Sequence, residues 1–249
     1  MTFAGYAWER FCFLSFAPLL VWTAATNLPY FGHLTYWTLA LHAVYFSVDK
    51  SSPHAKPAIY LLHGASFSGA MAIFMAYAAI CVGGKYKFGT WLEWEMAVGK
   101  RAGTTKWGDS FEIVVFQKSF EHIWPVIALL VDAMLSKDTL TAAIGGLPKF
   151  RTTALAVASF LAFGTLWEQT QKTVGKGSPL DVYLQPQELF ASHILGRFGI
   201  TPPDGLPEDI FFTNLQKICM VSFAFYFYWK FVAPYCGAAA KKAAGKKKA

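Results

Sequence analysis

Three polar side chains with catalytic potential, Thr35, Thr38 and His42, recur at i, i+3 and i+7 inside an apolar stretch. This spacing places all three on one face of a helix. Polar groups inside an apolar helix are costly and usually face the interior of a bundle, where they are candidates for function. A hydroxyl that faces an imidazole is the minimum for nucleophilic attack on an acyl carbon. The imidazole takes the hydroxyl proton during attack and later returns it to the leaving alcohol.

A second polar stripe follows along the chain in another apolar segment, with Lys118, Glu121, His122 and Asp132. Pro125 lies within this stripe and predicts a kink, with a backbone carbonyl freed three or four residues earlier. If both segments are helices that begin on the same side of a membrane, the upper parts of the two stripes meet. The sequence therefore predicts a candidate site between them.

The same residues also have structural interpretations. A threonine in a membrane helix commonly donates to the carbonyl four residues earlier, which applies to Thr38. A lone histidine such as His42 or His63 often serves as a hydrogen bond between helices. Lys118 and Glu121 can neutralise one another at their i, i+3 spacing. These alternatives stay open on the sequence alone.

The segments that must position these residues are strongly apolar. Of 249 residues, 55% are hydrophobic and 17% aromatic, whereas 15% are charged. A soluble domain has about 25% charged residues. We therefore expect an all-α, polytopic membrane protein with one domain over residues 1–235. Six stretches approach the length of about 20 residues that a spanning helix needs, at about 10–27, 33–48, 58–82, 111–135, 152–167 and 210–232.

The connections and termini predict an orientation. Two longer connections, 83–110 and 168–209, are expected on the non-cytosolic side, the second with a short helix near 186–198. Lysine and arginine in the other loops favour both termini on the cytosolic or matrix side. The formal charge is +7, but five lysines lie in the basic tail 236–249, so the rest of the chain carries +2. We expect membrane lipids as partners, and no nucleic acid.

Cofactor chemistry has little support in the sequence. The four cysteines are scattered without metal-ligand spacing, so we expect no metal and no cofactor. The small residues of 64–69, in the segment LLHGASFSGAMAIF, form small-xxx-small pairs suited to close helix packing. The final residues KKKA are similar to an endoplasmic-reticulum retrieval signal, although a generic basic tail explains them equally well.

The segment HLTYWTLALHAVYF at 33–46 resembles the second span of the androgen-induced and androgen-dependent TFPI-regulating membrane proteins. Leu34-Thr35-Tyr36 and the following Ala43-Val44-Tyr45-Phe46 match the family pattern at its internal spacing. A second match is His122, then Pro125, then an acidic residue ten positions after the histidine, Asp132. A weaker match is Leu166-Trp167, followed by Gly175, Gly177 and the pair Val182-Tyr183.

This resemblance implies a six-span intramembrane threonine hydrolase of the endoplasmic reticulum or plasma membrane. It implies Thr35 as nucleophile, His122 as base, and esters of fatty acids with hydroxy fatty acids as substrates. Possible supporting residues are Thr38, His42, Glu121 and Asp132. If the two helices start level with one another, Thr35 and His122 differ in depth by roughly 10–15 Å. Thr38 would then be the substitute nucleophile.

Two other functions remain as alternatives. The chain could be a non-catalytic accessory subunit of a large membrane complex, for example in the mitochondrial inner membrane, that keeps this fold. It could also be a small transporter that uses Lys118, Glu121 and Asp132 as a charged path. The hydrolase reading requires Thr35 or Thr38 to lie within hydrogen-bond reach of His122.

Overall fold

The computed structural model describes residues 3–26, 34–50, 52, 55–82, 111–136, 149–174, 196–205 and 208–235. These residues form helices and short connections, and no strand occurs among them, which confirms the all-α prediction. The helices are α1 (Phe3–Thr26), α2 (Leu34–Ser47), α3 (Lys56–Val82), α5 (Phe111–Leu135), α7 (Phe150–Val174) and α10 (Glu208–Phe227), the last continued by the π-helical turn η3 (Tyr228–Val232).

Each of the six predicted segments overlaps one of these helices, in the same order. The boundaries differ most at α1, which begins at Phe3, and at α7, which runs to Val174, so part of the expected connection 168–209 is helical. Polar residues at helix ends extend both helices beyond the apolar window from which they were predicted. The basic tail 236–249, the connection 83–110 and most of the expected short helix 186–198 lie outside the described residues.

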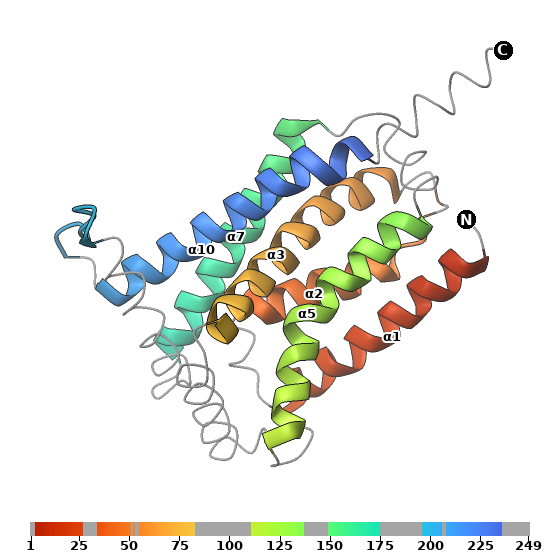
Figure 1. Ribbon diagram of the computed structural model, residues 1–249, viewed down its shortest axis with the longest axis horizontal. Coiled ribbons are helices and arrows are strands. Elements are labelled where there is room, and N and C mark those ends of the chain that lie inside the picture. The colour runs from red at the N-terminus through yellow and green to blue at the C-terminus, as the bar shows by residue number, and fades with distance from the viewer. Residues whose placement is uncertain are drawn as a thin grey trace.

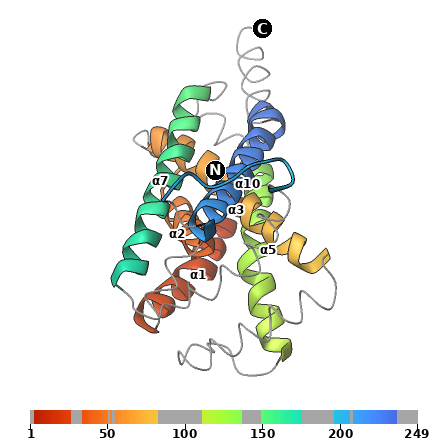
Figure 2. The same cartoon turned by 90° about the vertical axis from the view of Figure 1, so that its left-hand side faces the viewer.

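The helices lie side by side as a bundle with α3 at its centre (Figure 1). α3 contacts α2, α5, α7 and α10, while α1 lies at one side against α2 and α5. The view turned by 90° shows α7 and α5 on opposite sides of α3 (Figure 2). The start of α1 and the end of the helix formed by α10 and η3 lie toward the same end of the bundle (Figure 1).

Small residues let α3 and α7 approach their neighbours closely. A Cβ atom added to Gly69 would lie 2.6 Å from Oγ1 of Thr38 in α2, and one added to Gly64 would collide with Thr153 in α7. In α7, a Cβ at Gly164 would overlap the indole ring of Trp37 from α2. Close packing of this kind is how small residues stabilise helix pairs in membranes.

Indole side chains join α1 to α5. Trp8 Nε1 donates a hydrogen bond to the backbone oxygen of Ala128 at 3.2 Å, and Trp124 Nε1 donates to Ser15 Oγ at 2.9 Å. The Trp8 and Trp124 rings also meet edge to face, with centroids 5.7 Å apart. Pro125 lies within α5, and α5 bends part-way along its length in Figure 1, as expected when a proline removes a helical hydrogen bond.

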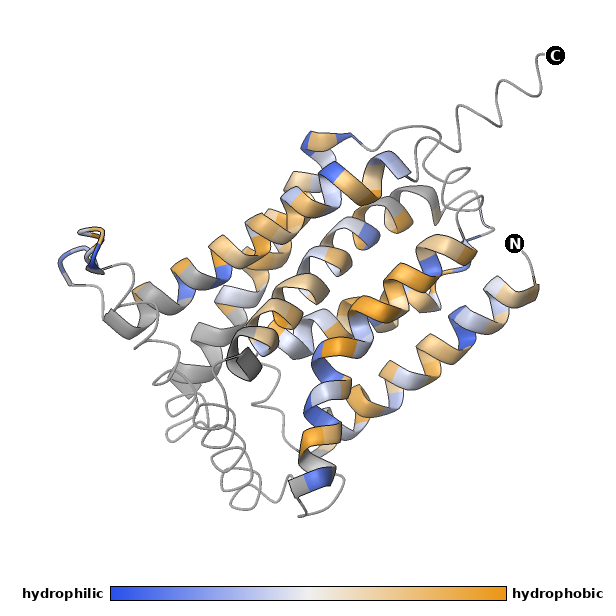
Figure 3. Ribbon diagram, viewed as in Figure 1, coloured by the Kyte–Doolittle hydropathy of each residue, from blue (hydrophilic) through white to orange (hydrophobic). Residues whose placement is uncertain are grey.

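Hydrophobic residues occur along every helix, with hydrophilic positions scattered among them (Figure 3). By hydropathy and length, one stretch of the described residues can cross a membrane, Leu61–Ala78 within α3. Phe150–Leu166 of α7 is a shorter apolar stretch. The other helices combine their apolar residues with charged, hydroxyl or aromatic ones, which lowers their mean hydropathy.

Candidate active site between α2 and α5

The structure brings the hydroxyl of Thr35 to the imidazole of His122. Thr35 is the second residue of α2, and its Oγ1 lies 3.4 Å from Nε2 of His122 in α5. Thr35 is 9% exposed and His122 is 6% exposed, so little water competes for this contact. A separation of 3.4 Å is long for a hydrogen bond, but contacts between a nucleophile and its base often tighten only when substrate is bound.

The other nitrogen of His122 sets the direction of this contact. Nδ1 lies 2.7 Å from the backbone oxygen of Lys118, which can only accept a hydrogen bond. Nδ1 therefore carries the proton, and Nε2 presents its lone pair to the hydroxyl of Thr35. This tautomer is the one that a general base requires.

An aromatic ring holds the imidazole from its face. Tyr77 of α3 stacks on His122 with ring centroids 5.0 Å apart and an angle of 19° between the planes. The hydroxyl of Tyr77 is itself 2.8 Å from Ser119 Oγ, one turn before His122 in α5. The imidazole of His122 is thus held by its own helix at Nδ1 and by α3 at its ring face.

The residues next to Thr35 and His122 are hydrogen-bonded to each other as well: Tyr36 follows Thr35 in α2, and Glu121 precedes His122 in α5. Tyr36 donates from its hydroxyl to Glu121 Oε1 at 3.0 Å. Gln117 Nε2 donates to the same oxygen at 2.9 Å, and Lys118 Nζ lies 3.3 Å from Oε2. The ion pair between Lys118 and Glu121 was one of the alternatives drawn from the sequence, and it is present in the structure.

Thr38 and His42 serve as packing and linking residues. The hydroxyl of Thr38 donates to Leu34 O at 2.9 Å, the backbone bond expected of a threonine in a helix. His42 has a backbone oxygen near each ring nitrogen, Thr38 O at 2.7 Å from Nδ1 and Pro125 O at 3.2 Å from Nε2. With acceptors on both sides, His42 links α2 to α5 and presents no free lone pair to a hydroxyl. Neither residue therefore belongs to the pair formed by Thr35 and His122, which is called the dyad below.

The depth difference expected between Thr35 and His122 is absent because α2 and α5 do not start level. The two helices run parallel, and the start of α2 lies beside the twelfth residue of α5. Thr35 is paired with His122 and Tyr45 with Asp132, and both pairs have a sequence separation of 87 residues. The register is therefore the same over ten residues, and Thr38 is not needed as a substitute nucleophile.

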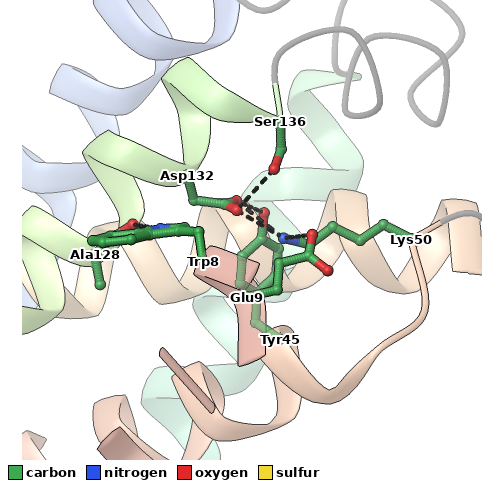
Figure 4. Close-up of polar contacts among 7 residues, drawn as sticks. All are labelled: Trp8, Glu9, Tyr45, Lys50, Ala128, Asp132 and Ser136. Atoms are coloured by element: carbon green, nitrogen blue, oxygen red, sulfur yellow. Dashed lines mark hydrogen bonds and ion pairs between the residues drawn. The ribbon is translucent and has the colours of Figure 1, made fainter. Parts of the chain in front are cut away.

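Asp132 belongs to a separate buried cluster near the far end of α2 (Figure 4). Its carboxylate receives Lys50 Nζ at 3.1 and 3.0 Å, Tyr45 OH at 2.6 Å and Ser136 Oγ at 3.0 Å. Oε1 of Glu9 forms an ion pair with the same ammonium group at 2.9 Å. Ten residues of helix, about 15 Å, separate Asp132 from His122, so its expected support of the dyad is not direct.

Several residues of these clusters were given no role in the site from the sequence. Tyr36 and Tyr77 look like ordinary apolar helix residues until a partner is known, and Gln117 is marked only by its i, i+4 spacing from Glu121. Glu9 and Lys50 lie at the edges of the predicted spans, where charged residues are common. Their burial and mutual contact depend on how α1 and the end of α2 pack.

His63 has the linking role that the sequence offered as its structural interpretation. Its Nδ1 lies 3.4 Å from the hydroxyl of Tyr228, the first residue of η3, and its ring lies between those of Tyr45 and Tyr228. It joins α3 to the last helix and does not contact the dyad through any of these bonds.

Comparison with models of protein families, with curated proteins and with solved structures finds no match for this chain. The function therefore has to be inferred from the geometry.

Proposed function

We propose that this chain is a six-span membrane protein that hydrolyses lipid esters, with Thr35 as nucleophile and His122 as general base. The observation that carries the proposal is the pair Thr35 Oγ1 and His122 Nε2, 3.4 Å apart in a buried position, with the proton of the imidazole held on Nδ1. Neither Thr38 nor His42, the second threonine and the histidine of α2, has this arrangement.

The proposal that the chain spans a membrane is supported by where its polar and apolar side chains lie, which is the reverse of the arrangement in a soluble protein. Charged side chains are buried in the bundle, among them Glu9, Lys50, Lys118, Glu121 and Asp132, each at most 6% exposed. Large apolar side chains cover the outward faces, and an exposed apolar surface of this extent requires an apolar surrounding. These exposed apolar side chains come from α1, α5, α7 and α10 with η3, and include Phe11, Leu14, Val21, Trp22, Phe116, Leu130, Met134, Leu155, Phe163, Leu166, Phe223 and Phe231.

Helix lengths agree with this proposal for five of the helices. α1, α3, α5 and α7 have 24, 27, 25 and 25 residues, and α10 with η3 is of similar length. At 1.5 Å per residue each exceeds the hydrocarbon thickness of about 30 Å. α2 has 14 residues, about 21 Å, and Thr35 near its start lies beside the twelfth of the 25 residues of α5, part-way through the proposed span. A lipid ester could therefore reach the dyad from the bilayer.

The chemistry follows from the orientation of the imidazole. As Thr35 Oγ1 attacks the ester carbonyl, Nε2 of His122 accepts its proton and then gives it to the leaving alcohol. Water then attacks the acyl-threonine and gives a proton to the same nitrogen. His122 passes this proton to Oγ1 of Thr35 as the acyl bond breaks, so the fatty acid leaves and the free hydroxyl is restored. No redox step and no added group is required for this balance.

The geometry gives less support to a transporter. The charged residues that such a path needs are bound to protein partners, Lys118 to Glu121 and Asp132 to Lys50. The partners come from the chain itself, so each of these charges already lies beside one of opposite sign.

The test is covalent labelling of the purified, folded protein by a fluorophosphonate, followed by mass spectrometry of the labelled peptide. We expect the label on Thr35, its loss in Thr35→Ala, and a fall in rate of about 100-fold or more in His122→Ala because the general base is removed. Thr38→Ala is the matched control and should label like the parent, since its hydroxyl is bonded to its own helix. A folded parent without label, or a label that persists in Thr35→Ala, would refute the hydrolase and favour the accessory-subunit alternative.

A further inference from the structure

A second side-chain hydrogen bond between α2 and α5 lies next to the contact of Thr35 with His122. Thr35 and Tyr36 are consecutive in α2, and Glu121 and His122 are consecutive in α5. Each residue of the first pair bonds one residue of the second, Thr35 to His122 and Tyr36 to Glu121. We infer that Tyr36 and Glu121 are positioning residues that set the distance and angle between the nucleophile and its base. This inference rests on the hydrolase proposed above.

Two adjacent bonds constrain the helices more than one does. A single contact allows α2 to roll about its axis or slide against α5, and either motion moves Oγ1 of Thr35 out of line with Nε2. The bond of Tyr36 lies one residue further along α2 and one residue earlier along α5, so both bonds are kept in only one relative placement of the helices. Because Tyr36 is 2% exposed and Glu121 is 1% exposed, water does not replace this bond.

The acceptor of this bond is held from its own helix. Gln117 donates to the same Glu121 oxygen that accepts from Tyr36, and Lys118 contacts the other oxygen. The carboxylate of Glu121 is thereby oriented before α2 contacts it. Through its bond to Tyr36, Glu121 acts on the dyad by placing α2 against α5.

The experiment compares Tyr36→Phe with Tyr45→Phe by the rate of fluorophosphonate labelling. Both variants remove a tyrosine hydroxyl that donates from α2 to a carboxylate of α5, at 3.0 Å to Glu121 and at 2.6 Å to Asp132. We expect Tyr36→Phe to label about 100-fold more slowly, as a misplacement of about 1 Å does. Tyr45→Phe should stay within about twofold of the parent, because it lies about 13 Å further along the helix.

A second pair of variants separates geometry from charge. Lys118→Met with Glu121→Gln keeps an acceptor oxygen for Tyr36 but removes both charges, whereas Lys118→Met with Glu121→Ala removes the acceptor as well. We expect the first double variant to label at a rate near the parent's and the second to be slowed like Tyr36→Phe. This comparison leaves Tyr36 unchanged, so it also decides the question if Tyr36→Phe does not fold.

The outcomes distinguish this inference from the proposed function. If the parent labels on Thr35 but Tyr36→Phe is as fast as the parent, or slowed no more than Tyr45→Phe, the positioning role is refuted and the hydrolase stands. If the glutamine double variant is as slow as the alanine one, Glu121 acts by charge and the positioning role is also refuted. If the folded parent takes no label, the hydrolase fails and the positioning role fails with it.

Discussion

The cluster of Lys50, Glu9 and Asp132 provides the sharpest test of the packing of this bundle. One ammonium group lies between two carboxylates, with side-chain exposures of 0%, 4% and 0%. Fully ionised, the cluster has a formal charge of −1. We predict that Lys50→Met, which keeps most of the volume of the side chain, destabilises the fold more than any neutralisation of a carboxylate.

The magnitudes follow from what each change leaves behind. Lys50→Met leaves two buried carboxylates without their cation, and breaking a buried pair in this way costs about 3–5 kcal/mol. Asp132→Asn leaves Lys50 paired with Glu9 but weakens the bonds from Tyr45 and Ser136, for about 1–3 kcal/mol. Glu9→Gln leaves Lys50 paired with Asp132 and removes the excess charge, so we expect a change within about 1 kcal/mol of zero.

The assay is thermal unfolding of the purified protein in one lipid or detergent, measured for the parent and the three variants. A loss of 1 kcal/mol lowers the Tm of a chain of this size by about 2–4 °C, so Lys50→Met should lower it by about 6–20 °C. Labelling of Thr35 below the Tm should be unchanged in all three, since the cluster lies about 15 Å along the helices from the dyad. A Glu9→Gln variant as unstable as Lys50→Met would refute the charge count and indicate that packing, not charge, holds this end together.

Two further predictions concern packing and surroundings. Gly164→Ala should lower stability by about 1–3 kcal/mol, because its Cβ would overlap the Trp37 ring, and thermal unfolding measures this; an unchanged Tm would show that α2 and α7 are not in contact there. Cys219 is exposed on α10. As the sole cysteine in lipid nanodiscs, it should resist a charged maleimide because the charged reagent does not enter the hydrocarbon. Thr201→Cys, on an exposed loop, is the control that should react within minutes, and equal reaction of both would refute the membrane-spanning proposal for α10.

The helices could be predicted because each coincides with a long apolar stretch of the sequence. The window 111–135 matches α5 residue for residue, with Glu112 in the first turn and Pro125 inside the helix. The ends of α1 and α7 were missed because Glu9 and Arg10 in the first, and Glu168 to Lys172 in the second, are polar residues that continue a helix past its apolar part. That these helices cross a membrane remains a prediction.

Thr35 and His122 could be named as candidate site residues from the sequence, but the residues that hold them in place could not. The resemblance supplied Thr35 and His122, and the structure places them within reach of one another. The role of Tyr36 could not be read from the sequence, because a tyrosine in an aromatic helix has no local mark that distinguishes a bonded hydroxyl from a packed ring. Asp132 was assigned to the dyad by its spacing alone, whereas its contacts are with Lys50 and Tyr45.

The spacing of Asp132 has a physical explanation in the register of α2 and α5. His122 and Asp132 are ten residues apart, as are Thr35 and Tyr45, and ten residues make nearly three turns of helix, about 15 Å. Two parallel helices therefore turn the same faces toward each other at both positions. The side chains are 3.4 Å apart in the dyad, a long contact, and 2.6 Å apart in the distant pair of Tyr45 and Asp132, a short hydrogen bond. The tight pair, joined to Lys50 and Glu9, stabilises the contact of α2 with α5 at the far end of α2, and the bond of Tyr36 to Glu121 sets the placement of the two helices at the dyad. The distance between Thr35 Oγ1 and His122 Nε2 can then remain at 3.4 Å in the free protein and shorten when an ester carbonyl binds.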